Sequence, residues 1–326
     1  MEKIVVDIYG ADAGTDVVIN GCKKALAKNS DLRLVMVGDK TLIETNMSAD
    51  ELNKIEIIDT DKFVKATDLP TCVYGSGDDF SMVKALLKLK EDDTCMGMVS
   101  AGNTGALMVG TICRLGLVEG LRCPALATAL PCRRNSFLCL VDCGANTECT
   151  PKDLQRFAVM GDAYIKSYTD IESPKIALMS VGREKGKGNA LVKEAYPLIE
   201  ELDINFIGNI EGNDFVDCEA DVVVTDGFTG NVLLKNTEAA GFAALALAKE
   251  VLNEENYAKV ETVIKDFFDF NSRGGAAFLG AKKPVIKMHG CANEETVVSC
   301  IELTTKLIRG GLDEKVLAAL KSLKKA

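Results

Sequence analysis

The feature that most constrains the fold of this 326-residue chain is a repeated order of short apolar run, polar loop and helical pattern. Amphipathic stretches such as 17–27 and 81–90 separate apolar runs that fit buried strands. This alternation is typical of a parallel sheet with crossover helices. Because no linker or shift in composition interrupts it, we expect a single α/β domain over 1–326, with three α/β/α layers and a mostly parallel sheet. The strand candidates are 4–8, 32–37, 55–58, 96–100, 125–130, 137–141, 175–181, 206–210, 222–225 and 285–288.

Residues 96–110 are the central example of this pattern, because apolar residues lead into a small polar loop and a helical run resumes at Ala106. The first N–H groups of a helix have no intrahelical acceptor and lie at the positive end of its dipole, so they favour anions. The stretch matches neither a Walker A loop nor the G-x-G-x-x-G dinucleotide fingerprint, and an ordinary glycine-rich turn is the alternative. The candidate anion-binding residues are Ser100, Gly102, Asn103, Thr104 and Gly105.

Other polar loops follow other strands, at the edge of an open parallel sheet where ligands bind. The loop 182–189 contains Lys185 and Lys187, which could neutralise an anion, although a mobile surface loop fits its composition equally well. Acidic residues at strand ends can hold such loops by accepting backbone N–H bonds, as we expect of Asp7, Asp142 and Asp226.

Composition excludes several classes of function. A formal net charge of −10 argues against a nucleic-acid binder, which carries a basic face. The 12 cysteines show no C-x-x-C spacing and the single histidine is His289, so we expect reduced thiols, no metal site and no cofactor. The chain starts with a strand-like Ile-Val-Val and has no apolar run near the ~18 residues of a membrane span, so we expect a cytoplasmic protein, with peripheral membrane contact left open.

A long helical segment is expected at 232–270. Its first part, 238–252, is rich in Ala and Leu and apolar on several faces, which favours core or dimer packing over contact with a membrane. We therefore predict a homodimer that uses this segment.

Seven short motifs carry a family resemblance. They are Ser-Ala-Gly-Asn-Thr-Gly-Ala at 100–106, Pro-Ala-Leu-Ala-Thr at 124–128, Asp-Cys-Gly-Ala-Asn at 142–146, Gly-Lys-Gly-Asn at 186–189, Gly-Asn-Ile-Glu-Gly at 208–212, Asp-Gly-Phe-Thr-Gly-Asn at 226–231 and His-Gly at 289–290. Together they resemble the bacterial phosphate acyltransferase family known as PlsX, over almost the whole chain and at the family's spacing. The resemblance implies a fold similar to that of phosphotransacetylases and the isocitrate dehydrogenase group, and a homodimer that associates with membranes in some members.

The resemblance also implies an activity, the synthesis of acyl phosphate from inorganic phosphate and a fatty acyl thioester of acyl carrier protein, for phospholipid synthesis. Direct attack by phosphate needs no enzyme nucleophile, in keeping with a sequence that offers no evident Ser-His-Asp arrangement. His289 could donate a proton to a phosphate oxygen or to the departing thiolate, and Asn103 and Lys185 complete the expected catalytic group. The expected phosphate- and substrate-binding residues are Asp7, Ser100, Gly102, Thr104, Gly105, Asn146, Lys187, Asn209 and Asn231.

Two cysteines, Cys143 and Cys291, are conceivable acyl-accepting nucleophiles. We disfavour both, because neither has an obvious base beside it in the sequence.

The chain departs from the family's pattern in two places. The usual Asp-Ala-Met-Gly-Gly-Asp-His is here Asp-Ile-Tyr-Gly-Ala-Asp-Ala at 7–13, without the histidine. After Pro70, a basic segment of the form Arg-x-Lys-x-Ser-Ser-Met is replaced by residues that include Asp78 and Asp79. Two alternatives therefore stay open, an enzyme that uses coenzyme A thioesters and a catalytically weak binding or regulatory protein.

Overall fold

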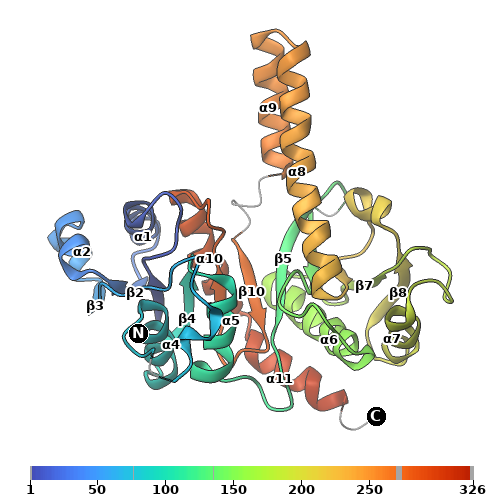
Figure 1. The fold of residues 1–326 in the computed structure, drawn as a ribbon, viewed down its shortest axis with the longest axis horizontal. Helices are drawn as coiled ribbons and strands as arrows, with labels where there is room; N and C mark the ends of the chain where they lie inside the picture. Colours follow the sequence, from blue (N-terminus) through green and yellow to red (C-terminus); the bar gives the residue numbers. More distant parts are fainter. Residues whose placement is uncertain (1, 76, 135, 269–273, 324–326) are drawn as a thin grey trace. The chain divides into compact units, whose positions relative to one another are not determined.

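The structure is a computed structural model that describes residues 2–75, 77–134, 136–268 and 274–323, in two compact units (Figure 1). Unit 1 comprises residues 1–124, 166–170 and 271–326, and unit 2 comprises 125–165 and 171–270. Each unit contains strands with helices packed on them. The single domain expected over 1–326 stays a prediction.

The sheet of unit 1 has the strand order β3-β2-β1-β4-β11-β10. Neighbouring strands are parallel, except that β10 and β11 are antiparallel. Most residues of β1, β2 and β4 are buried, as expected of parallel strands covered by helices. The strands are β1 (Lys3–Asp7), β2 (Arg33–Gly38), β3 (Ile55–Asp59), β4 (Cys95–Ser100), β10 (Ala276–Leu279) and β11 (Val285–Lys287).

Helices of unit 1 pack on this sheet. Helix α4 contacts β1, β2 and β4, whereas α10 contacts β1, β4 and β11 and lies beside α1. Helix α5 continues directly into a π-helical turn, η2. The helical elements are α1 (Thr15–Lys28), α2 (Lys40–Asn46), α3 (Ala49–Leu52), η1 (Pro70–Val73), α4 (Ser81–Glu91), α5 (Thr104–Gly110), η2 (Thr111–Leu115), α10 (Glu294–Arg309) and α11 (Leu312–Leu323).

The sheet of unit 2 has the order β5-β6-β9-β7-β8, with β5 and β6 antiparallel and the others parallel. Helices α8 and α9 pack against each other as a hairpin, drawn in orange in Figure 1, whose far end stands away from the sheet of its unit. The elements are β5 (Ala125–Cys132), β6 (Ser136–Val141), α6 (Pro151–Tyr168, of which 151–165 belong to unit 2), β7 (Lys175–Met179), α7 (Ala190–Glu200), β8 (Asn205–Ile210), η3 (Gly212–Asp217), β9 (Val222–Val224), α8 (Gly227–Val251) and α9 (Glu254–Phe268).

The predicted fold class, a mostly parallel α/β architecture with flanking helices, is confirmed. Two details of the prediction were wrong. Residues 227–231, which lie before the expected helical segment 232–270, form the first turn of α8, because the Asp226 side chain accepts the Thr229 amide and caps the helix. The short antiparallel strand β10 was not predicted. Residues 269 and 270, at the end of the expected segment 232–270, lie outside the described residues. Within the described ranges, no helix has the length and apolar character needed to cross a bilayer.

Candidate functional site

The loop after β4 is anchored by a row of residues at the carboxyl ends of three adjacent strands. In the register of the sheet, Ser100 of β4 pairs with Asp7 of β1 on one side and with Lys287 of β11 on the other. The backbone of β11 continues this pairing, because the Met288 amide donates to the Ser100 carbonyl at 2.9 Å. Residues distant in the sequence therefore meet directly beneath the glycine-containing loop 101–105.

Asp7 and Ser100 form a buried hydrogen-bonded chain. Ser100 Oγ donates to Asp7 Oδ2 at 2.8 Å, and the Gly102 amide donates to Ser100 Oγ at 3.1 Å. Burial raises the pKa of the Asp7 carboxyl to about 6, although hydrogen bonds from Ser100 and the Tyr9 amide oppose that rise. Asp7, Ser100 and Gly102, expected to bind phosphate, thus use these groups to bond with one another, and they fix the shape of the loop.

Asn103 begins helix α5. Its Oδ1 accepts the Ala106 amide at 3.0 Å, which is an N-cap bond, and its Nδ2 donates to the Ala66 carbonyl at 3.3 Å. The amides of Thr104 and Gly105 are the first two of the helix and have no acceptor in the part of the chain that the structure describes. The predicted strand, loop and helix are confirmed here, and the loop offers two outward amides at the positive end of α5.

Lys287 is a residue that the sequence analysis missed. Its ammonium donates to the Ala101 carbonyl at 3.1 Å and to the Met288 carbonyl, and its charge lowers the pKa of Asp7. The signal was present in the sequence, because a lysine near the end of an apolar strand is unusual unless it meets polar groups. Lys287 therefore supports the loop 101–105 from the β11 side.

His289 follows β11 and is exposed. Its Nδ1 lies 3.0 Å from Cys291 Sγ and accepts the Cys291 amide at 3.3 Å. The carbonyl of Gly290 accepts the Asp12 amide at 2.8 Å, which joins this turn to the loop after β1. The argument that Cys291 has no base nearby was wrong, since the imidazole two residues before it is within contact distance of the thiol. Cys143, in contrast, is buried, and burial raises the pKa of its thiol well above the usual value.

The divergent segment after Pro70 packs against the start of α5. A side-chain carbon on Gly105 would lie 2.8 Å from Pro70 Cγ, so only glycine permits this approach. Arg114, a second residue that the sequence analysis missed, holds the segment. Its guanidinium donates to the Val73 carbonyl at 3.0 Å and the Gly75 carbonyl at 2.7 Å, and it pairs with Asp78 at 2.7 Å.

In unit 2, the loop after β6 folds around the carboxylate of Asp142. This carboxylate accepts the amides of Gly144, Ala145 and Asn146 at 2.7–3.0 Å and the Asn146 side-chain amide at 2.7 Å. The predicted loop-holding roles of Asp7 and Asp142 are confirmed by these bonds, whereas Asp226 caps helix α8 and does not hold a loop. Asn231 lies in the first turns of α8, where its side-chain amide is next to Gly144.

The basic loop 182–189 is engaged by acidic residues of unit 2. Lys185 pairs with Glu200 and lies 5.3 Å above the Tyr196 ring, while Arg183 pairs with Asp214. Asn209 Nδ2 donates to the Glu184 carbonyl at 3.0 Å, so it braces the loop from β8. Lys187 is also in this loop, and its side chain packs against Gly182.

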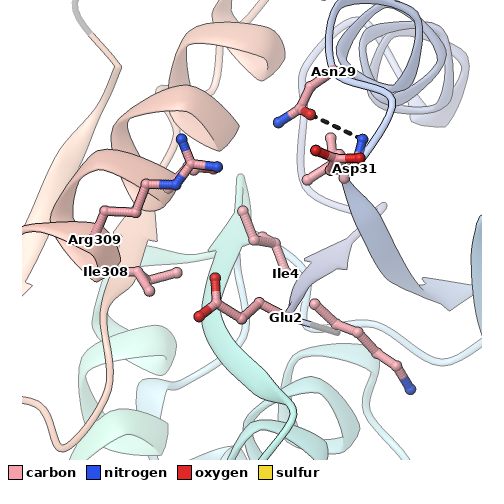
Figure 2. Close-up of a pocket in the computed structure, with 9 residues that line it drawn as sticks. Glu2, Ile4, Asn29, Asp31, Ile308 and Arg309 are labelled. Carbon is pink, nitrogen blue, oxygen red and sulfur yellow. Dashed lines mark hydrogen bonds between the residues drawn. The ribbon is translucent and has the colours of Figure 1, made fainter.

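A separate pocket of unit 1, of about 220 Å³, lies at the opposite, amino end of its strands (Figure 2). Its walls carry charges of both signs, from Glu2, Asp31, Lys3 and Arg309, and Asn29 Oδ1 accepts the Asp31 amide at 3.0 Å. Ligands of open parallel sheets bind at the carboxyl edge, so we place the candidate site at the β1, β4 and β11 loops. Among the described residues, no three His, Cys, Asp or Glu side chains are grouped to hold a metal ion.

Comparisons with known proteins agree with this architecture. The model of a family described as fatty acid synthesis protein matches residues 2–315. The phosphate acyltransferase of Clostridioides difficile (strain 630) is 36% identical over 324 residues, covering 96% of this chain and 95% of that protein. That of Bacillus cereus (strain G9842) is 37% identical over 316 residues, with 94% of each covered. The crystal structure of a phosphotransacetylase from Streptococcus pyogenes has a similar fold, with a TM-score of 0.67 over 94% of each chain and 17% identity.

Proposed function

Because this chain belongs to the phosphate acyltransferase family, we propose that it transfers a fatty acyl group from the thioester of acyl carrier protein to inorganic phosphate. The product, an acyl phosphate, would serve phospholipid synthesis. The similar fold of a phosphotransacetylase motivates one alternative donor, a coenzyme A thioester. Coenzyme A carries the acyl group on the same kind of thiol as acyl carrier protein.

The observation that carries this proposal is the pair of outward amides of Thr104 and Gly105 on a loop fixed by Asp7 and Ser100. Such amides can hold phosphate oxygens without the cost of reorganising the loop. In our proposal Thr104, Gly105 and Asn103 contact phosphate. Asp7, Ser100, Gly102 and Lys287 position them.

The reaction needs one bond to form and one to break. A phosphate oxygen attacks the thioester carbonyl carbon, the carbon–sulfur bond breaks, and the thiolate leaves and takes up a proton. We assign the proton donation to His289, which is exposed at the end of β11 in the same unit as the phosphate loop. No covalent enzyme intermediate is required.

Residues of unit 2 are proposed to bind the donor. Lys185 and Lys187 place two cations on the loop 182–189, which suits an acidic carrier protein or the phosphates of coenzyme A. We propose that Lys185 exchanges its Glu200 partner for substrate when the donor binds. Asn146 and Asn209 shape the loops that contain them, and Asn231 orients the substrate from α8.

We also propose that the hairpin of α8 and α9 joins two copies in a homodimer of a cytoplasmic enzyme. Large apolar side chains are exposed along it, with Phe242, Leu247, Val251 and Val263 each 64–79% exposed in the single chain. Exposed apolar patches on this scale mark interfaces. The same surface could instead make peripheral contact with a membrane.

The altered segment after Pro70 favours one further candidate, a weakly active regulatory protein. In it the acidic Asp78 and Asp79 pair with Arg114 and Lys62, so those cations are neutralised. A phosphate-binding role for either cation would require that pairing to open.

The deciding experiment is thiol release from a long-chain acyl-acyl carrier protein, with and without inorganic phosphate. We expect phosphate-dependent release by the wild type and a large loss in Asn103→Ala. Asn103→Ser is the matched control, because a serine side chain can still cap helix α5 but lacks the side-chain amide of asparagine. Release from coenzyme A thioesters alone would favour the alternative donor, and no release from either would favour the regulatory protein.

A further inference from the structure

Unit 2 contains a pocket of about 380 Å³ that none of the proposed site residues line. It lies beyond the carboxyl ends of β7 and β9, between the loop after β7 and the first turns of α8. Its walls are largely aliphatic, formed by Leu154, Met179, Val181, Val192, Val232 and Leu233. The volume is within the range of small-molecule sites.

One polar group of this pocket, the Ser180 hydroxyl, has no hydrogen-bond partner among the described residues. Ser180 is 9% exposed, and its Oγ is buried. Buried hydroxyls nearly always have a partner, so this one indicates a ligand atom.

The other polar side chains beside it are already used. Asn189 Oδ1 accepts the Val192 amide at 2.9 Å and so caps α7, and Asp226 accepts the Thr229 amide and hydroxyl at 2.8 Å and caps α8. The hydroxyl of Ser180, in contrast, is buried without a partner among the described residues and is available to bond with a ligand inside the aliphatic walls.

Gly188 keeps the space beside Ser180 open. Its φ is +108°, and a side-chain carbon there would lie 2.6 Å from Val192 Cγ1 and 3.2 Å from Ser180 Oγ. Any other residue would be strained and would crowd the serine. Gly188 and Asn189, at the end of the basic loop 182–189, thus line the pocket, and Gly188 leaves this wall open.

We propose that this pocket binds the pantetheine arm that carries the acyl thioester, an inference that rests on the proposed function. The arm is slender and has both methyl groups and amides, so it satisfies aliphatic walls and a buried hydroxyl together. A hydrocarbon chain would leave Ser180 without a partner. Acyl carrier protein and coenzyme A share this arm, and the cations at residues 183, 185 and 187 suit the charged group at its far end.

The first arm of the test measures binding of free pantetheine to the full chain by calorimetry. Leu233→Trp fills the pocket, and we expect it to weaken binding by about tenfold or more. Leu234→Trp, one residue further along α8 and outside the pocket lining, is the matched control with little effect. Ser180→Ala should weaken binding by about fivefold, the loss of one neutral hydrogen bond. Absence of binding by the wild type, or equal affinities of the two tryptophan variants, would overturn the proposal.

The second arm compares turnover of octanoyl-pantetheine with that of octanoyl-N-acetylcysteamine, which lacks the distal part of the arm. Leu233→Trp should raise the KM for the first thioester only and leave the KM for phosphate unchanged. A rise for both thioesters that grows with acyl length would assign the pocket to the acyl chain and overturn the proposal. Parallel titrations with coenzyme A and holo acyl carrier protein identify the natural source of the arm. If no thioester is turned over but pantetheine binding still depends on Leu233, the proposed function fails while the pocket assignment stands.

Discussion

The Ser100 hydroxyl donates a 2.8 Å hydrogen bond to the Asp7 carboxylate across adjacent strands β1 and β4. Both residues are almost fully buried. This hydrogen bond links the carboxyl ends of β1 and β4, so its loss should lower both the stability and the activity of the protein.

Asp7→Asn should remove a pH dependence of stability. The folded-state pKa of Asp7, about 6, lies above its unfolded value near 3.8, so the folded state binds more protons between those values. The protonated Asp7 side chain therefore contributes fully to the free energy of unfolding below about pH 4. This contribution is lost as the pH rises through about 6, which lowers the free energy of unfolding by about 3 kcal/mol. Denaturant unfolding from pH 4 to 8 should show the wild type losing stability relative to Asp7→Asn. The control Asp203→Asn, at an exposed position, should show the same pH dependence of stability as the wild type. If the free energies of unfolding of the wild type and Asp7→Asn differed by the same amount at every pH, this account would be contradicted.

Ser100→Ala should lower the free energy of unfolding by about 2 kcal/mol, because it leaves the Asp7 carboxyl and the Gly102 amide each without this partner. Urea titration measures the change. Thr111→Val is the control, since its hydroxyl is buried without a partner among the described residues and its removal should cost little. Similar losses in both variants would mean that the hydrogen bond itself adds nothing.

Arg114→Ala should free the segment that Arg114 holds through the carbonyls of Val73 and Gly75. Limited proteolysis should then cut between residues 73 and 78, and the KM for phosphate should rise, because Pro70 supports the start of α5. Arg114→Lys should restore only part of the protection, as an ammonium cannot reproduce the guanidinium fork. Arg33→Ala, which loses carbonyl contacts in another turn, should leave this cleavage unchanged.

Cys291 should be the most reactive of the exposed thiols, because His289 Nδ1 lies 3.0 Å from its sulfur and can take up its proton. Mass spectrometry after brief treatment with N-ethylmaleimide should find Cys291 modified before Cys113 and Cys123. His289→Gln should slow that reaction by about tenfold. Equal rates at the three cysteines would show that the imidazole does not activate the thiol.

The double variant Phe242→Ser/Leu247→Ser should shift a homodimer toward monomer, since it removes two side chains that are 73% and 64% exposed on α8 of the single chain. Light scattering coupled to size exclusion gives the mass. Lys259→Ser on α9, which removes only an exposed charge paired with Glu255, should keep the wild-type mass. A monomeric wild type would exclude the dimer, and vesicle flotation would then test the membrane contact.

Most of the sheet could be predicted from the sequence, because β1, β2 and β4 are buried apolar runs bounded by polar turns. The start of α8 could not, since Gly227 and Gly230 suggest a loop until the Asp226 cap and the surrounding packing are known. Strand β10 was missed because its sequence, Ala-Ala-Phe-Leu, begins with two alanines, which are depleted in strands. The site was predicted as a set of loops, and the strand, loop and helix at 96–110 are confirmed. Lys287 stands out as a lysine near the end of an apolar strand, but its partners and those of Arg114 were not predictable, because segments distant in the sequence bring the carbonyl groups of Ala101 and Val73 to them.

The strands of unit 1 are not contiguous in the chain, and this has a consequence for synthesis. Strand β4 is complete at residue 100, but its neighbour β11 and the covering helix α10 come only after residue 284. Once synthesis has passed residue 124, β4 is therefore an unpaired sheet edge while unit 2 is still being made. Such an edge can pair with other chains. This edge of the N-terminal segment therefore stays open to pairing with other chains until β11 and α10 have been synthesised.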